Sequence, residues 1–230
     1  MNVYQIRLKL YTLKDINCED IQIKISHFID SAMVDNKEFR ELHDKNEYKY
    51  FTFDMLYPQE ADKVYKNGKI YTLTIRTINE QLAHFFYEEL QNRYTDDLKG
   101  LTTEIKIISK RHITTVYGLT PIVIKNDNGY WRTNLSIDDF ENRLKANLVK
   151  KFKRFTKSDM NEDFELFTMI EFTNKMPVAV KYKNIKLLGD KITLHIADNA
   201  KAQDLIYMAL GTGIGENNAR GSGFLNYKWL

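Results

Sequence analysis

The side chains best suited to move protons near neutral pH are two histidines in the first part of the chain, His27 and His43. A histidine titrates close to neutrality, so it can act as a base or as an acid. Lys49 follows His43 by six residues and can supply a positive charge or a proton. Acid–base catalysis needs a group that accepts a proton, a group that donates one and positive charge near the reacting atoms. These three residues are therefore candidates for that chemistry.

His43 is the first candidate because it lies at the end of a polar helical segment, outside any apolar stripe. The alternative is a solvated histidine that the helix dipole favours. His27 is the second candidate: it falls about 160° from the apolar stripe of its helix, beside Lys24 and Ser31 at spacings of three and four. That polar face can meet RNA; the alternative is an ordinary surface histidine. On one straight helix the two histidines would lie about 24 Å apart, so they share a phosphate only if the chain breaks near Asp35-Asn36 and folds back.

The most unusual stretch is glycine-rich: five of the ten glycines lie between Gly211 and Gly223. Glycine lets backbone amides approach a ligand closely, and a run of such amides can form an anion-binding nest. No Gly-Lys-Ser/Thr follows, and Glu216 occupies the third glycine position of the dinucleotide fingerprint. The alternative is a tight connection between a helix and a strand. Five glycines exceed what one turn needs, which favours the ligand-binding interpretation.

Two further stretches are basic. The first, over 150–157, can complement the dipole at a helix C-terminus while Phe152 and Phe155 anchor the helix, or it can contact phosphates. The second can be a β-hairpin whose side chains reach an RNA stem, since A-form RNA is bound mainly through its backbone and shape. Its lysines are Lys181, Lys183 and Lys186.

The elements that must position these residues follow from the hydrophobic pattern. Alternating polar and apolar residues predict four strands in the first half, at 3–12, 50–56, 70–78 and 101–109. Helices are expected from Ile21, with Asn17 as N-cap, and after the N-cap Asn79. A short helix over 37–43 follows the break at Asp35-Asn36. The order strand, helix, strand, strand, helix, strand is that of a ferredoxin-like (RRM-like) domain.

The second half repeats this order less cleanly. Extended segments are expected at 112–125, 164–173, 191–197 and 224–230. One helix follows a capping signature at Ser136, and another begins after Asn199 and is capped by Gly211. The predicted fold class is α+β, with two tandem ferredoxin-like (βαββαβ) domains and a C-terminal glycine-rich loop. Their expected bounds are 1–110, 111–230 and, for the loop, 211–223.

Three blocks of sequence resemble the CRISPR repeat-processing endoribonucleases of the RAMP superfamily. The spacing Gly-x-Gly, five residues, Gly-x-Gly, just before the final strand, is similar to their glycine-rich loop. Arg220 fits a basic residue often found there, whereas Ser222 departs from the usual apolar residue. Leu42-His43 followed by the aromatic segment 48–53 looks like the family's histidine and its next strand. Residues 119–123 are similar to the segment that opens the second domain.

The resemblance implies a metal-independent endoribonuclease that cleaves CRISPR precursor RNA within the repeat and leaves a 2′,3′-cyclic phosphate. It assigns His43 as general acid or base and Lys49 to charge stabilisation. The family often has a tyrosine where this chain has Phe28, so His27 is expected to assist instead. The residues expected to bind RNA lie in the loop, on the first helix and on the basic hairpin: Gly213, Gly215, Asn217, Asn218, Arg220, Gly221, Gly223, Lys24, Ser31, Lys181, Lys183 and Lys186.

Two other functions stay open. One is a non-catalytic RNA-binding RAMP subunit of a CRISPR effector complex, and the other is a small-molecule-binding ferredoxin-like protein. The net charge of +3, from 34 basic and 31 acidic residues, is too mild to decide between them. The expected partner is CRISPR repeat RNA, with other effector-complex subunits and either a monomer or a homodimer left open.

Composition restricts the cofactors and the compartment. With 43% hydrophobic and 28% charged residues the chain is typical of a globular protein. Cys18 is the single cysteine, so a Cys-based zinc site and an internal disulfide are excluded. The pairs Asp96-Asp97 and Asp138-Asp139 sit at helix ends, where capping explains them, so no metal and no cofactor is expected. No apolar run approaches the roughly 18 residues of a membrane span, and the first ten residues lack the apolar core of a signal peptide. We therefore expect a cytoplasmic protein with no membrane partner.

Overall fold

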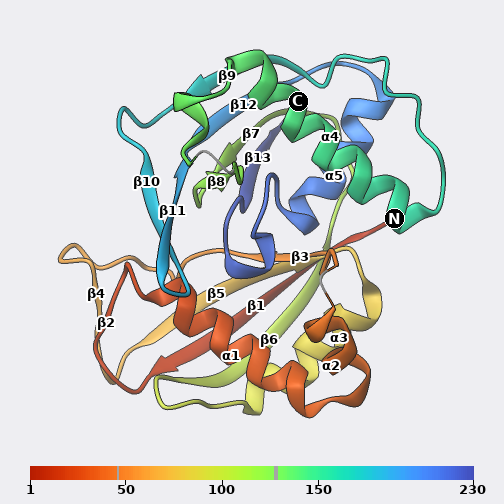
Figure 1. Ribbon diagram of the computed structural model, residues 1–230. Helices are drawn as coiled ribbons and strands as arrows, with labels where there is room; N and C mark the ends of the chain where they lie inside the picture. Colours follow the sequence, from red (N-terminus) through yellow and green to blue (C-terminus); the bar gives the residue numbers. More distant parts are fainter. Residues whose placement is uncertain (46, 127–128) are drawn as a thin grey trace.

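The computed structural model describes residues 1–45, 47–126 and 129–230, apart from the side chains of His43 and Asp44. Figure 1 shows two α+β units stacked one above the other, each with its own antiparallel sheet. None of the helices in the described ranges is both long and apolar enough to span a bilayer.

The first unit has the ferredoxin-like order that the sequence predicts. Its sheet runs β3-β5-β1-β6, with every neighbouring pair antiparallel. The polar-apolar alternation of β1 places Ile6, Leu8 and Leu10 in the core, where they are completely buried. The elements of this sheet and its two helices are β1 (Val3–Thr12), α1 (Ile21–Asp35), β3 (Phe51–Phe53), β5 (Ile70–Thr77), α3 (Glu80–Glu89) and β6 (Leu98–Ile108).

The remaining elements of this unit are short, and they lie next to the ends of its helices. β2 (Ile16–Asn17) pairs with β4 (Val64–Tyr65), and η1 (Leu90–Asn92) follows α3. Because Asn17 lies in β2, it does not cap α1: the N-cap is Asp20, and the predicted cap is wrong. The predicted break is confirmed, because Asn36 ends α1 and caps α2 (Lys37–Asp44) by accepting from the amides of Glu38 and Phe39. Asn79 caps α3 as expected.

The second unit has the same topology, with a sheet of order β13-β7-β12-β9. Its main elements are β7 (Ile113–Gly118), α4 (Ile137–Thr156), β9 (Phe167–Phe172), β12 (Ile192–Ile196), α5 (Ala200–Thr212) and β13 (Leu225–Trp229). Between β9 and β12 the hairpin β10 (Val178–Tyr182) and β11 (Ile185–Asp190) pairs with β8 (Ile122–Val123). The described residues of this unit also form two short 3-10 turns, η2 (Trp131–Thr133) and η3 (Asn218–Arg220).

The ends of the two helices in this unit were predicted with unequal success. Ser136 and Asp139 form the predicted capping box at the start of α4. The cap of α5 is Gly213, with a φ of 72°, so the prediction of Gly211 is wrong. Gly211 stays helical and is needed for packing, because a Cβ there would lie 2.8 Å from Ile78 Cγ2.

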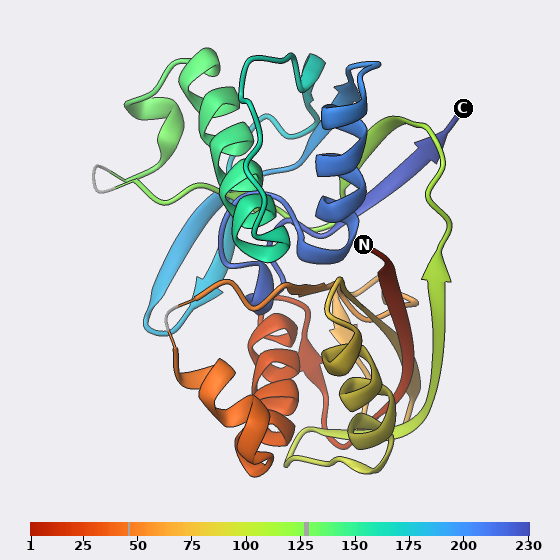
Figure 2. The ribbon, with the colours of Figure 1, turned by 90° about the vertical axis from the view of Figure 1, so that its right-hand side faces the viewer.

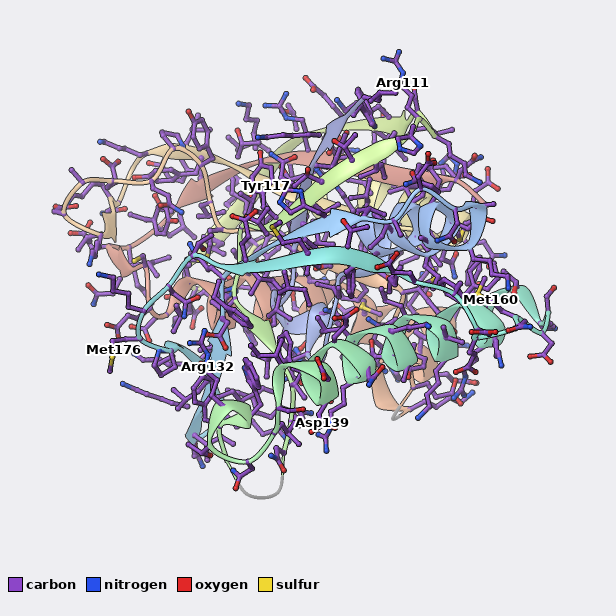
Figure 3. The ribbon with its side chains drawn as sticks, turned by 90° about the horizontal axis from the view of Figure 1, so that it is seen from above. Arg111, Tyr117, Arg132, Asp139, Met160 and Met176 are labelled. Atoms are coloured by element: carbon purple, nitrogen blue, oxygen red, sulfur yellow. The ribbon has the colours of Figure 1, made fainter. Side chains whose placement is uncertain are left out.

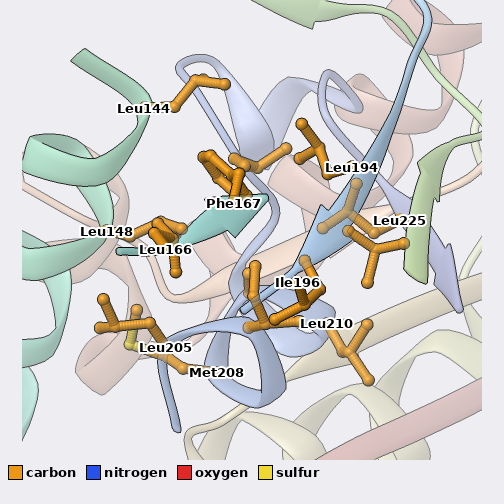
Figure 4. Packing of buried hydrophobic residues seen from close by; sticks show 14 of the residues in the cluster. Leu144, Leu148, Leu166, Phe167, Leu194, Ile196, Leu205, Met208, Leu210 and Leu225 are labelled. Carbon is orange, nitrogen blue, oxygen red and sulfur yellow. The ribbon is translucent and has the colours of Figure 1, made fainter. Parts of the chain in front are cut away.

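Two apolar clusters form the core, and the second extends across the boundary between the units. In it α4 and α5 pack on the second sheet (Figure 4), together with Val3, Ile78 and Ile108 of the first unit. The Tyr207 hydroxyl of α5 donates to the carbonyl of Ile108 at 2.6 Å and accepts from the amide of Val3 at 3.2 Å. We propose 1–110 and 111–230 as the domains, since β6 ends at Ile108 and β7 begins at Ile113. The two share a packed interface.

Candidate functional site

A cavity of about 800 Å³ lies between the two units. Its walls are Lys45 and the segment 47–51 after α2, one face of α4, the glycine-rich loop and Tyr182 of the hairpin. Figure 2 shows the loop after α5 reaching down between α4 and α1. Only Glu47 and Glu216 are acidic in the described lining, against eight basic residues: Lys45, Lys49, Lys125, Arg143, Lys150, Lys151, Arg154 and Arg220. The cavity is therefore suited to an anionic ligand.

Helix α4 supplies a row of polar and basic side chains to this cavity. Arg143, Asn147, Lys150 and Arg154 are spaced by four, three and four residues, so they share one face of the helix. Figure 3 shows α4 running from Asp139 toward Met160 along one side of the molecule. We call these four residues the α4 row. A straight helix bearing cations at this spacing can follow a chain of phosphates.

The segment after α2 is held against α4 by two contacts. Arg154 forms a salt bridge of 2.7 Å with Glu47, and the rings of Phe155 and Tyr50 meet edge to face with centroids 5.1 Å apart. Burial raises the pKa values of both Tyr48 and Tyr50 above their ordinary value. The Tyr50 hydroxyl is buried and has no hydrogen-bond partner among the described residues. It can therefore donate to a ligand.

Lys49 lies on the cavity wall, at the end of α2. Its ammonium donates to the carbonyls of Leu42 and Lys45, the second at 2.6 Å. These carbonyls belong to the turn that carries His43, so the cation sits where the helix dipole is most negative. The backbone of His43 is the penultimate position of α2, whereas its side chain lies outside the described part of the structure. Lys49 and the end of α2 are thus brought to the cavity together.

His27 is exposed on α1 and is not among the residues that line the cavity. Its neighbours Lys24 and Ser31 are engaged elsewhere: Lys24 forms a salt bridge of 2.9 Å with Asp97, and the Ser31 hydroxyl accepts from Arg93 Nε at 2.9 Å. The structure therefore does not bring these three predicted residues to the cavity. Phe28 is fully buried.

Other side chains of α1 contact the glycine-rich loop. Gln22 donates to the carbonyl of Gly221 at 2.8 Å, and Asp30 forms a salt bridge with Arg220. Since the loop belongs to the second unit and α1 to the first, these bonds tie the loop to the first unit.

The loop is a folded hairpin whose glycines are buried, not an open nest of amides. The amides of Gly213, Gly221 and Gly223 donate to protein carbonyls at 2.8–2.9 Å. At Gly223, with a φ of 68°, a Cβ would come 1.9 Å from the carbonyl oxygen of Ile214, and at Gly221 it would come 2.6 Å from the ring of Phe53. The expected anion nest therefore does not form from these three amides, because close packing accounts for the glycines.

Four predicted loop residues do line the cavity: Gly215, Asn217, Asn218 and Arg220. The Asn218 side chain is used inside the loop, where its Nδ2 donates to the carbonyls of Ile214 and Ser222. Asn217 differs, because its Nδ2 is buried and has no hydrogen-bond partner among the described residues. It is the loop side chain best placed to bind a ligand.

Lys151 is a site residue that was not predicted from the sequence. Its side chain is buried, and Nζ donates to the carbonyls of Gly213 and Gly215 at 3.1 and 3.2 Å and to Asn218 Oδ1 at 2.6 Å. Burial lowers its pKa to about 7. A signal was present: position 151 continues the apolar stripe of Leu144 and Leu148 at a spacing of three, where a lysine needs a buried partner.

The basic hairpin lies close to α1 and to the cavity. Lys181 forms a salt bridge of 2.6 Å with Asp20, which occupies its charge, whereas Lys183 and Lys186 are exposed. Tyr182 lines the cavity with the ammonium of Lys125 5.6 Å from its ring centre. Within the described ranges, no three histidine, cysteine or acidic side chains are grouped so that they could hold a metal ion.

Comparison with known proteins gives one family and one fold. The family model described as CRISPR associated protein Cas6, C-terminal, matches residues 102–227. A solved CRISPR associated protein Cas6 is 21% identical with a TM-score of 0.70, over 98% of this chain and 99% of that one. A RAMP protein that binds different RNA substrates is 18% identical with a TM-score of 0.74 and the same coverage. The product of a Cas6-related gene from Pyrococcus furiosus is 18% identical with a TM-score of 0.69, over 98% of both chains. No curated protein matches the sequence.

Proposed function

The chain belongs to the Cas6 family of CRISPR-associated proteins, and on this premise we propose that it cleaves CRISPR precursor RNA within the repeat to release guide RNAs. In this reaction the 2′-hydroxyl group of one nucleotide attacks the adjacent phosphorus, and the bond to the 5′-oxygen of the next nucleotide breaks. The products are a 2′,3′-cyclic phosphate and a 5′-hydroxyl. The chemistry needs a base, an acid and positive charge. We propose the cytoplasm as its location.

The observation that carries the proposal is the basic cavity between the two units. Eight basic side chains against two acidic ones line this cavity among the described residues, and the ammonium of one of them, Lys151, is buried and bonded to the loop. The other seven give the cavity the positive charge that binds phosphates. The end of α2 forms one wall and the glycine-rich loop another, so a backbone bound there passes close to both. A small uncharged ligand would not require such an excess of positive charge.

His43 is the proposed general acid or base, because it stands at the end of α2 two residues before Lys45, which lines the cavity. Lys49 is proposed to stabilise charge on the phosphate, since its ammonium lies on the same wall. His27 was a third candidate. Because it is exposed outside the cavity lining, we assign it no step at a phosphate held there.

The RNA backbone is proposed to follow the α4 row and to meet the loop at Asn217. The unpartnered Nδ2 of Asn217 is a donor suited to a phosphate or a ribose oxygen. Lys183 and Lys186, exposed on the hairpin, extend the basic surface toward a stem. The buried glycines and Asn218 are proposed to support this surface and not to touch RNA.

A direct test uses repeat RNA in excess EDTA. We expect cleavage to persist, with 2′,3′-cyclic phosphate ends identified by mass spectrometry, and His43→Ala to slow it by roughly 10²–10⁴-fold. His84→Ala is the matched control, because His84 is exposed on α3 outside the cavity lining, and its rate should match that of the unaltered protein. When single nucleotides of the repeat are replaced in turn by their deoxyribose forms, only the replacement that removes the attacking 2′-hydroxyl should block cleavage.

Two results would contradict the mechanism: a strict requirement for a metal ion, or full activity in His43→Ala. If the unaltered protein and His43→Ala both bind repeat RNA tightly, with equal affinity, and neither cleaves it, the result would instead support a non-catalytic RNA-binding subunit of an effector complex. Binding of RNA with no dependence on salt would argue against both RNA functions, because phosphate contacts release counterions.

A further inference from the structure

Lys151 joins the two walls of the cavity from a buried position in α4. On one side its ammonium donates to Gly213, Gly215 and Asn218 of the glycine-rich loop. On the other side it lies 5.9 Å from the ring centre of Tyr48, in the segment that connects α2 to β3. Both walls that the proposed reaction needs are therefore in contact with one cation.

The neighbours of Lys151 on the same helix reinforce the second contact. Arg154 pairs with Glu47, and Phe155 packs on Tyr50. The spacings of three and four residues place these side chains on one side of α4. The salt bridge is exposed and contributes little by itself, whereas Lys151 is buried and acts on both the segment and the loop.

The donors of Lys151 are saturated. An ammonium group carries three protons, and three oxygens accept from it at 2.6–3.2 Å. No proton is left over for a substrate in this arrangement, which argues against a direct chemical role. An apolar side chain of the same length would leave the Gly215 carbonyl and the Asn218 amide oxygen without this donor, and the Gly213 carbonyl would keep only the Thr212 hydroxyl at 3.3 Å. Buried acceptors that lose a donor move toward water.

We propose that Lys151 is a positioning residue that holds the glycine-rich loop and the segment 47–50 in register across the cavity, so that RNA bound at the loop lies against the end of α2. This inference rests on the proposed function for its consequence in RNA cleavage. Its structural part, the ordering of two segments by one buried cation, holds in the protein without RNA.

The test compares Lys151→Met with Lys153→Met, which removes the same charge from the same helix. Lys153 pairs with Asp159 and Glu162 and does not line the cavity. Hydrogen exchange of the RNA-free proteins reports the order of residues 213–223 and 47–50. Single-turnover cleavage reports the Kd for repeat RNA separately from the rate of the chemical step.

In Lys151→Met we expect the amide hydrogens of both segments to exchange faster than in the unaltered protein. We also expect Kd for repeat RNA to rise by at least about tenfold and the chemical step to slow by at least about tenfold. For Lys153→Met the exchange rates, Kd and the rate of the chemical step should each stay within about twofold of the values for the unaltered protein. If Lys151→Met does not fold, Lys151→Gln, which retains two donors, takes its place with smaller effects in the same direction. A merely structural lysine would lower the melting temperature but leave Kd and the chemical step unchanged below the melting transition, and that result would overturn the proposal.

The outcome also separates this inference from the proposed function. If the unaltered protein neither binds nor cleaves repeat RNA, the proposed function fails and the exchange measurement alone decides the role of Lys151. Faster exchange in both segments then supports the ordering role, and unchanged exchange refutes it.

Discussion

The guanidinium of Arg76, in the first unit, donates a hydrogen bond of 2.6 Å to the carbonyl of Leu225, in the second. Arg76 is 5% exposed, and its Nε donates to the side chain of Gln5 at 3.0 Å. The ring of Phe224 lies below the cation at 4.5 Å. Desolvation lowers the pKa of Arg76 to about 10, so the group stays charged at neutral pH. A buried cation thus links β5 to the strand that follows the glycine-rich loop.

Arg76→Met should therefore destabilise the protein by about 3 kcal/mol, because a charge-assisted hydrogen bond is lost and two buried acceptors lose their donor. Urea unfolding at pH 7 measures the change. Arg7→Met is the control, since Arg7 is exposed on the neighbouring strand β1 and should change the unfolding free energy by less than about 0.5 kcal/mol. Equal effects in the two variants would show that Arg76 contributes nothing across the interface.

Alanine should be tolerated less well at Gly223, in the glycine-rich loop, than at Gly68, outside it. Gly223 and Gly68 both have positive φ, at 68° and 79°, so alanine costs about 1–2 kcal/mol of backbone strain at either. A Cβ at Gly68 would make an ordinary contact of 3.6 Å with Tyr11, whereas at Gly223 it would lie 1.9 Å from the carbonyl oxygen of Ile214. We expect Gly223→Ala to be the more destabilising by at least about 2 kcal/mol in urea unfolding and to weaken RNA binding, while Gly68→Ala leaves binding intact. Equal stability of the two variants would contradict the tight packing of the loop.

The α4 row predicts how RNA affinity depends on salt. Arg143→Gln should lower affinity for every RNA sequence to a similar extent, because a phosphate contact carries no sequence information. The slope of log affinity against log salt should fall by roughly 0.7–0.9, the value for one released counterion. Filter binding between low and moderate salt measures it. Lys153→Gln removes a charge from the face of α4 that does not line the cavity, and an equal fall in slope there would argue against a specific path along the row.

Elements whose signals are local in sequence were predictable. The alternation of β1, the capping box at Ser136 and the break at Asn36 each depend on residues within a few positions of one another. The order of these elements suffices for two ferredoxin-like units. Asn17 was wrongly predicted to cap α1, because its backbone pairs with Val64, far away in sequence, and that pairing outweighs the local capping preference.

The site was less predictable, because its partners are distant in sequence. A glycine-rich run looks the same whether its amides face a ligand or a protein carbonyl, and here Gly223 donates to Pro121. Lys151 belongs to a basic run that resembles a solvated surface, and its burial depends on the loop more than sixty residues later. The basic residues around the cavity come from both units, so only the folded chain brings them together.

Burial of Lys151 also predicts how stability depends on pH. Because its pKa falls from an ordinary value near 10.5 to about 7 on folding, the unfolded chain binds the proton more tightly than the folded protein between these values. The contribution of Lys151 to the free energy of unfolding therefore rises with pH from about 7 upward, by at most about 1.4 kcal/mol per pH unit for one proton. Below pH 7 this contribution does not change with pH. Glu216 and Tyr48 face the ammonium, and both remain in Lys151→Met.

The measurement is urea unfolding at pH 6, 7, 8 and 9 for the unaltered protein and for Lys151→Met. The difference between the two stabilities should grow in favour of the unaltered protein as pH rises above 7, since only that protein releases the proton on folding. Lys153→Met, whose parent lysine is raised in pKa by its acidic partners, should not show this growth. A difference that stays constant from pH 6 to 9 would mean that Lys151 keeps its proton throughout, because its three acceptors then outweigh the cost of burying the charge.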